Sequence, residues 1–149
     1  LYLYFKDKED LFFQLITDGM EVMLEHLAAV TASERPFREK LCAACEAVSR
    51  TFRERHSLFR ALAQSGAFAR HAARHRQLVA NRRRLAEGMI RILEQGRQTG
   101  EIRSDLELST AECALVGAVH GVDFRVMHGG EDIAIEHVVD LFLQGAGHD

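Results

Sequence analysis

Polar groups that could bind a nucleic-acid backbone gather at the start of the chain. Tyr2, Tyr4 and Lys8 surround Asp7, which stands where a helix N-cap belongs, and Asp10 follows three residues later in an acidic variant of the capping box. Hydroxyls, lysine ammonium groups and helix N-terminal amides are the usual donors to phosphate. By residue type alone, this run indicates a phosphate contact or an ordinary amphipathic junction in equal measure.

Two cysteines form a C-x-x-C pair, Cys42 and Cys45. Redox chemistry of the thioredoxin kind would need this pair at a helix N-terminus after a strand, but here it lies two turns inside a predicted helix. A zinc site would need two more ligands close by, and the only other cysteine is Cys113. The pattern favours small core residues over a redox or metal site.

Histidine and arginine side chains offer two further candidates on the longest helical pattern. His71 and His75 are four residues apart and share a helix face, which a metal could use, but no carboxylate follows at metalloprotease spacing. Arg82, Arg83 and Arg84 point in three directions and are typical of a solvated face. One of them could still pair with an anionic ligand group or with a carboxylate on another helix. We expect no metal and no cofactor.

Polar residues inside apolar stretches are the best sequence clues to a ligand. His120 and Asp123 are three residues apart and can face one groove, and Ser49 is a similar case. A buried His beside a carboxylate is more often a satisfied pair than a ligand contact. The sequence contains no Ser-His-Asp order, glutamate pair or glycine-rich phosphate loop, so it does not predict an enzyme.

The composition predicts one all-helical domain. The chain has 149 residues, 47% hydrophobic and 28% charged, with one Pro and no Trp, and its Ala, Leu, Arg and Glu are good helix formers. A net charge of -3 means that any nucleic-acid contact must be local. Three cysteines suit a reducing cytoplasm, and no apolar run approaches the roughly 20 residues of a membrane span.

Apolar periodicity places the helices. The first runs from Lys8 to about Val30, and the second has Pro36 at its first position. His56-Ser57 is expected to be a junction, followed by a short helix, Leu58–Ala63, that Gly66 closes. Further helices are expected over about 67–98, after a cap at Ser109 and Thr110, and after a cap at Asp132.

The last two helices are too apolar for one face of a small core. Gly117 and Gly121 are one turn apart and would let another helix approach closely. We therefore predict that two helices from each of two subunits form a four-helix bundle about a two-fold axis. The alternative is that both are central helices of a monomer. The predicted dimer interface comprises Gly117, Gly121, Ile135, Val138, Val139 and Phe142.

Two runs resemble the TetR family of bacterial transcriptional repressors. Leu1-Tyr-x-Tyr-Phe-x-Asp-Lys-Glu-x-Leu11 resembles the end of the family's helix-turn-helix and the start of its next helix. Gly100-Glu-Ile-Arg-x-Asp105 resembles the end of the family's long helix. The two runs are about a hundred residues apart and occur in the expected order, so the resemblance covers essentially the whole chain.

The resemblance implies an all-α, multi-helix regulatory core with a C-terminal two-helix dimerisation hairpin. Residues 1–7 would be the remnant of the DNA-binding domain, with Tyr2, Tyr4 and Lys8 touching operator phosphates, and residues 8–149 the ligand-binding and dimerisation domain. The chain starts in mid-element without an initiator Met, so we expect a fragment that does not bind an operator by itself. The helix from Lys8 would connect the DNA head to the core and carry the ligand signal.

The expected function is that of a ligand-responsive repressor, acting as a cytoplasmic homodimer on operator DNA with no membrane partner. The effector would be small and hydrophobic or amphipathic. One alternative is a helical protein-interaction module without a ligand. Another is a helical-bundle metal enzyme, but such enzymes carry a Glu-x-x-His motif that Glu112 and Glu136-His137 do not match. The predicted pocket residues are Cys45, Ser49, Phe52, Phe59, Leu62, Met89, Val119, His120 and Phe124.

Overall fold

The structure is a computed structural model that describes residues 5–147. It confirms the all-α prediction, because the described residues form helices and a single isolated β-bridge between Ile102 and Gly147. None of the described helices is both long and apolar enough to cross a membrane. The helices are α1 (Lys8–Ala32), α2 (Phe37–Ser65), α3 (Ala67–Arg70), α4 (Ala72–Gln98), α5 (Leu108–Met127) and α6 (Ile135–Ala146).

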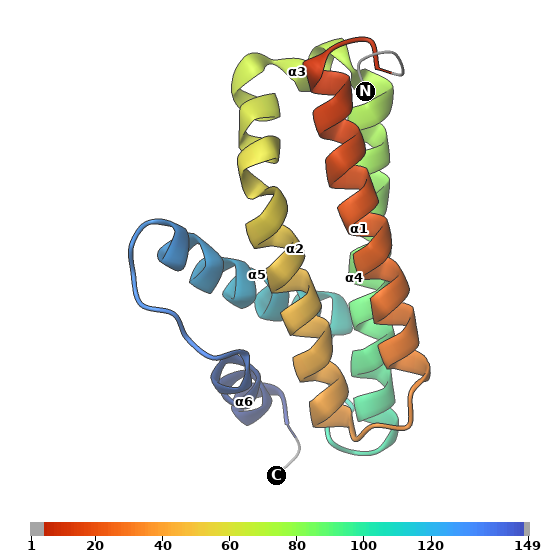
Figure 1. The fold of residues 1–149 in the computed structure, drawn as a ribbon. Coiled ribbons are helices and arrows are strands. Elements are labelled where there is room, and N and C mark those ends of the chain that lie inside the picture. The colour runs from red at the N-terminus through yellow and green to blue at the C-terminus, as the bar shows by residue number, and fades with distance from the viewer. Residues whose placement is uncertain (1–4, 148–149) are drawn as a thin grey trace.

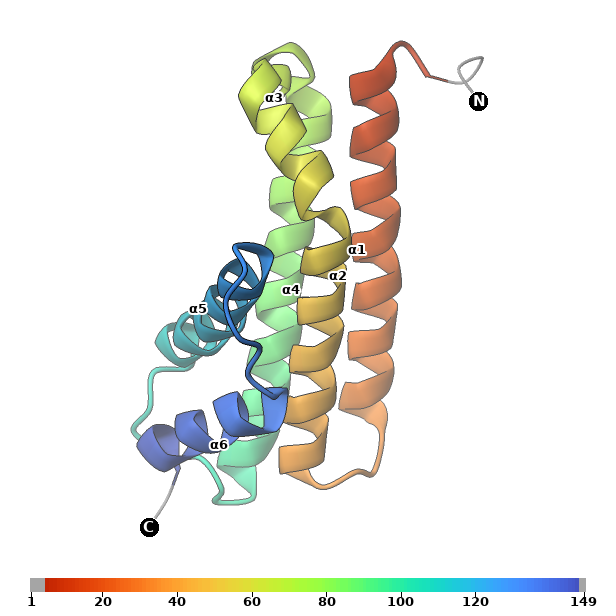
Figure 2. The ribbon, with the colours of Figure 1, turned by 60° about the vertical axis from the view of Figure 1, so that its left-hand side comes forward.

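Three long helices form the body of the molecule. Figure 1 shows α1, α2 and α4 side by side, with the short α3 at the end where α1 begins and with α5 running across the bundle. In Figure 2, α5 and α6 lie together on the side of the bundle away from α1. The helix that would connect to a DNA-binding head and the helices predicted to dimerise are thus on opposite sides.

Helix α1 begins as predicted. The Asp7 side chain accepts a hydrogen bond from the Asp10 amide at 2.8 Å, and the Asp10 carboxylate accepts one from the Lys6 amide at 3.4 Å. The two bonds resemble a capping box, except that the second is donated by the amide of Lys6, one residue before the N-cap. The helix ends at Ala32, where the Ser33 amide donates to the Val30 carbonyl. Asp7 therefore fixes the direction in which the chain enters α1.

Helix α2 is longer than predicted. The junction at His56-Ser57 and the separate helix Leu58–Ala63 were wrong, because α2 continues without a break to Ser65. Neither His nor Ser removes a backbone hydrogen bond, and both are tolerated within a helix. The predicted stop is confirmed, since Gly66 adopts φ +75°, a left-handed conformation that favours glycine, and donates its amide to the Leu62 carbonyl.

The single helix predicted over 67–98 was also wrong. It is divided into α3 and α4 by His71, whose backbone leaves the helical region at φ -117° and ψ 56°. The His71 ring lies beside α1, with Nε2 3.4 Å from an Asp7 oxygen and 3.5 Å from a Glu9 oxygen. These contacts join residues more than sixty positions apart, so no local periodicity could have indicated them.

Both caps predicted for the C-terminal helices were displaced. Glu107, rather than Ser109 or Thr110, caps α5, and its carboxylate accepts the Ser109 amide at 3.1 Å and the Thr110 amide at 2.7 Å. A longer carboxylate side chain reaches the same free amides that a Ser or Thr cap would satisfy. Asp132 does not cap α6, which begins after Ala134 with no side-chain cap.

The buried apolar side chains form two clusters. The larger one lies where α1, α2, α4, α5 and α6 meet, and there Phe37 packs so closely on Gly96 that a Cβ at that glycine would overlap the ring. The second cluster lies at the α3 end, between α1, α2 and α4. Its buried members are Phe13, Ile16, Leu62, Ala67 and Leu78.

Candidate ligand-binding site

A cavity of about 360 Å³ opens between the two apolar clusters. Its walls come from α1, α2 and α4, with one residue from α5. The volume is within the range of small-molecule sites, about 300 to 1,000 Å³. The lining residues are Ile16, Met20, Met23, Val48, Thr51, Phe52, Arg55, His56, Phe59, His75, Leu78, Val79, Arg82, Leu85 and His120.

The cavity has one wall that is entirely apolar and another, the basic wall, in which basic residues lie among apolar ones. Every lining residue from α1 is apolar, whereas the basic lining residues come from α2, α4 and α5. Phe59 on α2 and Val79 on α4 are 43% and 47% exposed, so this side of the cavity reaches the surface. Among the described residues, no Asp or Glu lines it. Such an arrangement suits a molecule with an apolar body and a polar or anionic end.

Arg55 joins this cavity to α1. Its Nε donates a hydrogen bond to the Leu15 carbonyl at 3.1 Å, and its guanidinium lies directly over Gly19, where a Cβ would be 2.6 Å from Nε. The absence of a side chain at Gly19 is what allows this approach. A residue that lines the cavity therefore contacts the backbone of the helix that leads toward the N-terminus.

A buried polar network lies next to the cavity on the α5 side. Asp123 is inaccessible to solvent, and its Oδ1 accepts hydrogen bonds from Ser49 Oγ and Arg53 Nε, both at 2.6 Å. Arg53 also reaches Asp132 at 3.0 Å, in the segment before α6. Burial alone would raise the pKa of Asp123, but the neighbouring His120, Ser49 and Arg53 groups outweigh it and hold that pKa below its ordinary value.

His120 connects this network to the cavity. Its ring stacks on Phe52 with centroids 4.2 Å apart, and its Nδ1 lies 3.7 Å from Asp123 Oδ2, beyond hydrogen-bond distance. Within residues 5–147, both of these buried atoms have no hydrogen-bond partner. His120 and Asp123 therefore lie close together without a direct hydrogen bond, and the histidine also faces the cavity.

Arginine and histidine side chains gather on the α2 side of the site. Burial lowers the pKa of His56, and nearby Arg60, His128 and His120 lower it further. The His56 ring also packs edge-on against Phe124, with centroids 5.1 Å apart. This part of the cavity disfavours additional positive charge and would favour an anion.

Three of the nine predicted pocket residues, Phe52, Phe59 and His120, line the cavity. Phe124 packs against Phe52 with centroids 5.3 Å apart, and Ser49 belongs to the Asp123 network. The other four lie in the apolar clusters rather than on the cavity wall: Cys45, Leu62, Met89 and Val119.

The basic side of the cavity was largely missed. His75 was noted only for its spacing from His71, and His56 only as a junction. Among Arg82, Arg83 and Arg84, one was expected to be able to pair with an anionic ligand group or a carboxylate on another helix. Arg84 pairs with Glu21 on α1 at 2.9 Å, and Arg82 lines the cavity. A one-per-turn spacing of His75, Val79 and Arg82 along α4 was the available signal.

The candidate metal and redox groups have structural partners. His75 stacks on Phe68, 4.3 Å between centroids, whereas His71 points to Asp7 and Glu9. Those three residues could surround a metal ion, but Glu9 is already paired with Arg70. Cys42 and Cys45 are buried, and burial raises both pKa values, that of Cys45 to about 12, which makes these thiols poor nucleophiles.

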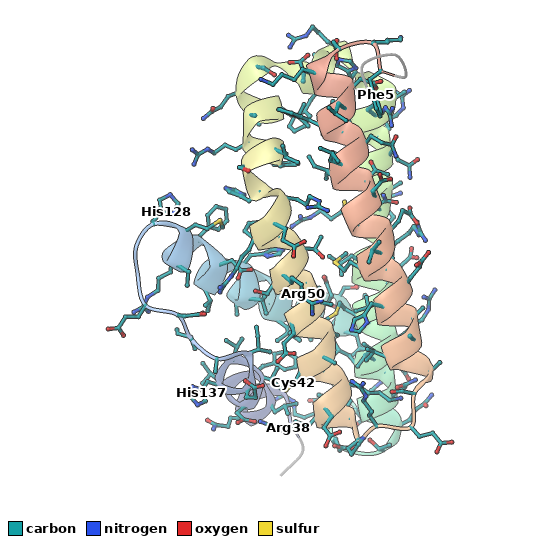
Figure 3. All side chains as sticks on the ribbon, in the orientation of Figure 1. Phe5, Arg38, Cys42, Arg50, His128 and His137 are labelled. Carbon is teal, nitrogen blue, oxygen red and sulfur yellow. The ribbon has the colours of Figure 1, made fainter. Side chains whose placement is uncertain are left out.

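Four charged residues and one histidine hold the start of α1 against α3 and α4. Arg70 pairs with Glu9, Arg74 donates to the Asp10 carboxylate at 2.9 Å, and His71 lies 3.5 Å from Glu9. Figure 3 shows Phe5 at this same end of the molecule. We call this group the N-terminal ion-pair cluster: Glu9, Asp10, Arg70, His71 and Arg74.

The residues predicted to touch DNA lie at the N-terminal end of the chain. Lys8 is exposed, with its Nζ 5.5 Å from the centroid of the Phe12 ring. Tyr2 and Tyr4 lie outside the described residues.

The predicted dimer residues divide into two groups. Gly117 and Gly121 on α5 are exposed, with open space around each Cα, whereas Val138 and Val139 on α6 are already buried within the subunit. Ile135 and Phe142 are half-buried and pack against the larger cluster. Leu141, which was not predicted, is 71% exposed and is the most exposed large apolar side chain among the described residues.

Helix α6 is attached to α2 by a charged pair as well as by packing. Arg38 Nε donates to Asp140 Oδ1 at 2.8 Å, and its NH2 reaches Oδ2 at 3.1 Å, which is a bidentate pair. In Figure 3, Arg38 and Cys42 lie on the part of α2 next to α6, and His128 lies at the far end of α5.

Comparisons with known proteins agree on the fold. Residues 34–125 match the model of the family "Tetracyclin repressor-like, C-terminal domain", which is more than half of the chain. No curated protein sequence is significantly similar to the chain.

Solved structures of several regulators are similar over almost the whole chain. One is PfmR from Thermus thermophilus, a TetR family transcriptional regulator with TM-score 0.75 and 21% identity, covering 96% of this chain and 79% of its own. The fatty acid degradation regulator FadR from Bacillus halodurans has TM-score 0.67 and 18% identity, with coverages of 96% and 73%. A TetR family regulator from Marinobacter aquaeolei has TM-score 0.63 and 22% identity, with coverages of 99% and 77%.

Proposed function

Because this chain belongs to the tetracycline-repressor-like C-terminal domain family, we propose that it is the effector-binding and dimerisation core of a transcriptional repressor. The single observation that carries the proposal is the cavity of about 360 Å³ between α1, α2, α4 and α5. A small amphipathic molecule would occupy it. The regulator would act in the cytoplasm on operator DNA, and we assign it no catalytic role.

The contacts of α1 suggest how occupancy would reach the DNA. Ile16, Met20 and Met23 of α1 form one wall of the cavity, and Arg55 binds the Leu15 carbonyl from α2. A ligand that packs against this wall would favour one tilt of α1 over another. The ligand can shift the equilibrium between the two conformers only by the difference in its affinity for them. The favoured tilt of α1 would then set the spacing of the two DNA-binding heads.

The exposed apolar side of α5 and α6 supports a homodimer. Gly117 and Gly121 leave a path along α5 for a close helix, and Leu141 of α6 is largely uncovered. A second copy of the chain would bury this surface in a four-helix bundle, as in an isologous two-fold interface. The alternative, an interaction module without a small-molecule ligand, is less consistent with an open internal cavity.

The experiment is to fill the cavity and measure DNA release. In a protein that carries a complete helix-turn-helix N-terminal to α1, Thr51→Trp places an indole in the cavity wall, whereas Arg50→Trp changes an exposed neighbour. We expect both variants to bind operator in fluorescence anisotropy, and only Thr51→Trp to stop responding to an effector that releases the parent protein. An effector that releases Thr51→Trp as readily as the parent would refute the cavity as the sensor.

A further inference from the structure

The titratable groups of the cavity are all of one kind. Arg55, His56, His75, Arg82 and His120 line it, and among the described residues no carboxylate does. In a chain whose net charge is -3, a wall without an acidic residue is a local departure from the average surface. Such a wall attracts an anion, and more strongly than it would in water because the rest of the cavity is apolar.

Arg82 is the cation most available to a ligand. Among residues 5–147 it takes part in no ion pair, in contrast to Arg84, which binds Glu21 of α1. The charge of Arg82 acts on the carboxyl group of Glu112 on α5. Burial is the main cause that raises the pKa of Glu112, and it disfavours the charged form of that carboxyl. An unpaired guanidinium at the edge of an apolar cavity is suited to bind a carboxylate or phosphate through two hydrogen bonds.

The neighbouring imidazoles can contribute donors. His56 and His120 flank Phe52, with ring centroids 5.0 Å and 4.2 Å from it. Behind His120, Asp123 would repel an anion, but the charge of Arg53, which with Ser49 binds Oδ1 of that carboxylate, compensates it. The side of the cavity formed by α2, α4 and α5 therefore presents positive charge and N–H groups among its apolar residues, while α1 presents only apolar side chains.

From this separation we propose that the effector is an anionic amphiphile, whose negatively charged group binds between Arg82, His56 and His120 and whose apolar chain lies against Ile16, Met20 and Met23 of α1. The inference rests on the proposed function and specifies its ligand class. It also assigns Arg82 as the residue that determines charge specificity. The apolar chain, rather than the charged group, is then the part of the ligand that contacts the connector helix.

The test uses three probes with the same alkyl chain and different head groups. Decanoate, 1-decanol and decyltrimethylammonium are titrated into the chain by isothermal calorimetry. A charge-assisted hydrogen bond contributes about 1.5 to 3 kcal/mol, so we expect decanoate to bind at least roughly tenfold more tightly than decanol and the cation to bind most weakly. In Arg82→Gln, decanoate affinity should fall roughly tenfold, with decanol affinity unchanged.

Matched controls separate this site from general surface binding. Arg83→Gln removes an exposed neighbouring charge and should leave both affinities unchanged, whereas Thr51→Trp should weaken decanoate and decanol alike. Equal binding of decanoate and decanol, or a preference for the cation, would overturn the inference and leave the proposed function standing. Absence of binding by all three probes would overturn both the inference and the amphipathic effector.

Discussion

At the scale of single residues, Asp123 is a buried carboxylate whose charge must be compensated by neighbouring groups. A carboxylate with no solvent contact is stabilised only by groups that the fold brings to it, here Ser49 and Arg53 from α2. Removing one partner of a buried charged pair typically costs 3 to 5 kcal/mol because the other is left uncompensated. Arg53 retains Asp132 as a second partner, which limits the cost.

We predict that Asp123→Asn lowers the free energy of unfolding by about 3 kcal/mol at neutral pH, measured by urea denaturation. The folded-state pKa of Asp123 lies below its ordinary value of 3.8, so its stabilising contribution is present above that pH and is lost as the pH falls through the folded-state pKa. The difference between parent and variant should therefore shrink below about pH 4.

The control for this prediction is Asp105→Asn, which removes a carboxylate that is 82% exposed and 3.3 Å from Arg103. An exposed pair of this kind contributes little, so its variant should stay within about 0.5 kcal/mol of the parent. If Asp123→Asn were equally harmless, the network would not contribute to stability. A difference that did not change with pH would mean that the Asp123 charge is not responsible.

At the scale of elements, the N-terminal ion-pair cluster determines how firmly the start of α1 is held. Asp10 is nearly buried, and Arg74 supplies the charge that compensates it. Burial raises the pKa of Asp10, but the hydrogen bond and charge of Arg74, together with the Lys6 amide and His71, outweigh it and hold that pKa below its ordinary value. The first turns of α1 thus depend on a side chain of α4, and a signal that moves α1 must act against this contact.

We predict that Arg74→Gln loosens the first turns of α1 without unfolding the domain. An unpaired carboxylate at a nearly buried position costs about 1 to 3 kcal/mol, so amide hydrogen exchange over residues 11–15 should accelerate roughly tenfold or more. Exchange in the middle of α5 should be unchanged. Arg76→Gln, an exposed position on the same helix, is the control. Equal exchange in the two variants would mean that the cluster does not hold α1.

At the scale of the whole molecule, the distribution of apolar surface supports the proposed dimer. The subunit already buries Val138 and Val139, so these two residues hold α6 to its own chain. The surface left for a partner lies along Gly117 and Gly121 of α5 and at Leu141 of α6. A two-fold pairing would bring each such surface against its own copy.

We predict that Leu141→Glu weakens dimerisation by roughly 100-fold or more, because two unpaired carboxylates would be desolvated in each interface. Sedimentation velocity over a concentration series measures the change. Val22→Glu is the matched control and should leave the dimer intact, since Val22 is 66% exposed and belongs to α1, which Figure 2 shows on the other side of the bundle from α5 and α6. An unchanged association constant in Leu141→Glu would exclude α5 and α6 as the interface.

The sequence alone was sufficient for the features that depend on local chemistry. Composition predicted the all-helical fold, apolar periodicity predicted the extent of α1, and the aspartate at position 7 predicted its cap. Gly66 predicted that a helix stops there, although that helix is the continuous α2 rather than a separate short one. The two short runs at the N-terminus and at Gly100–Asp105 indicated the family that the comparison confirms. Each of these signals lies within a few residues of the structure it specifies.

Only the tertiary structure decided which helix faces meet. The break at His71 arises beside α1, the cap of α5 is a glutamate, and the basic wall of the cavity combines residues from three helices. Periodicity shows that a residue such as Met89 is buried, but it cannot distinguish a packed core from a cavity wall, because both are covered by apolar neighbours. That distinction depends on how far apart the helices stand, and this distance is fixed by side chains remote in the sequence.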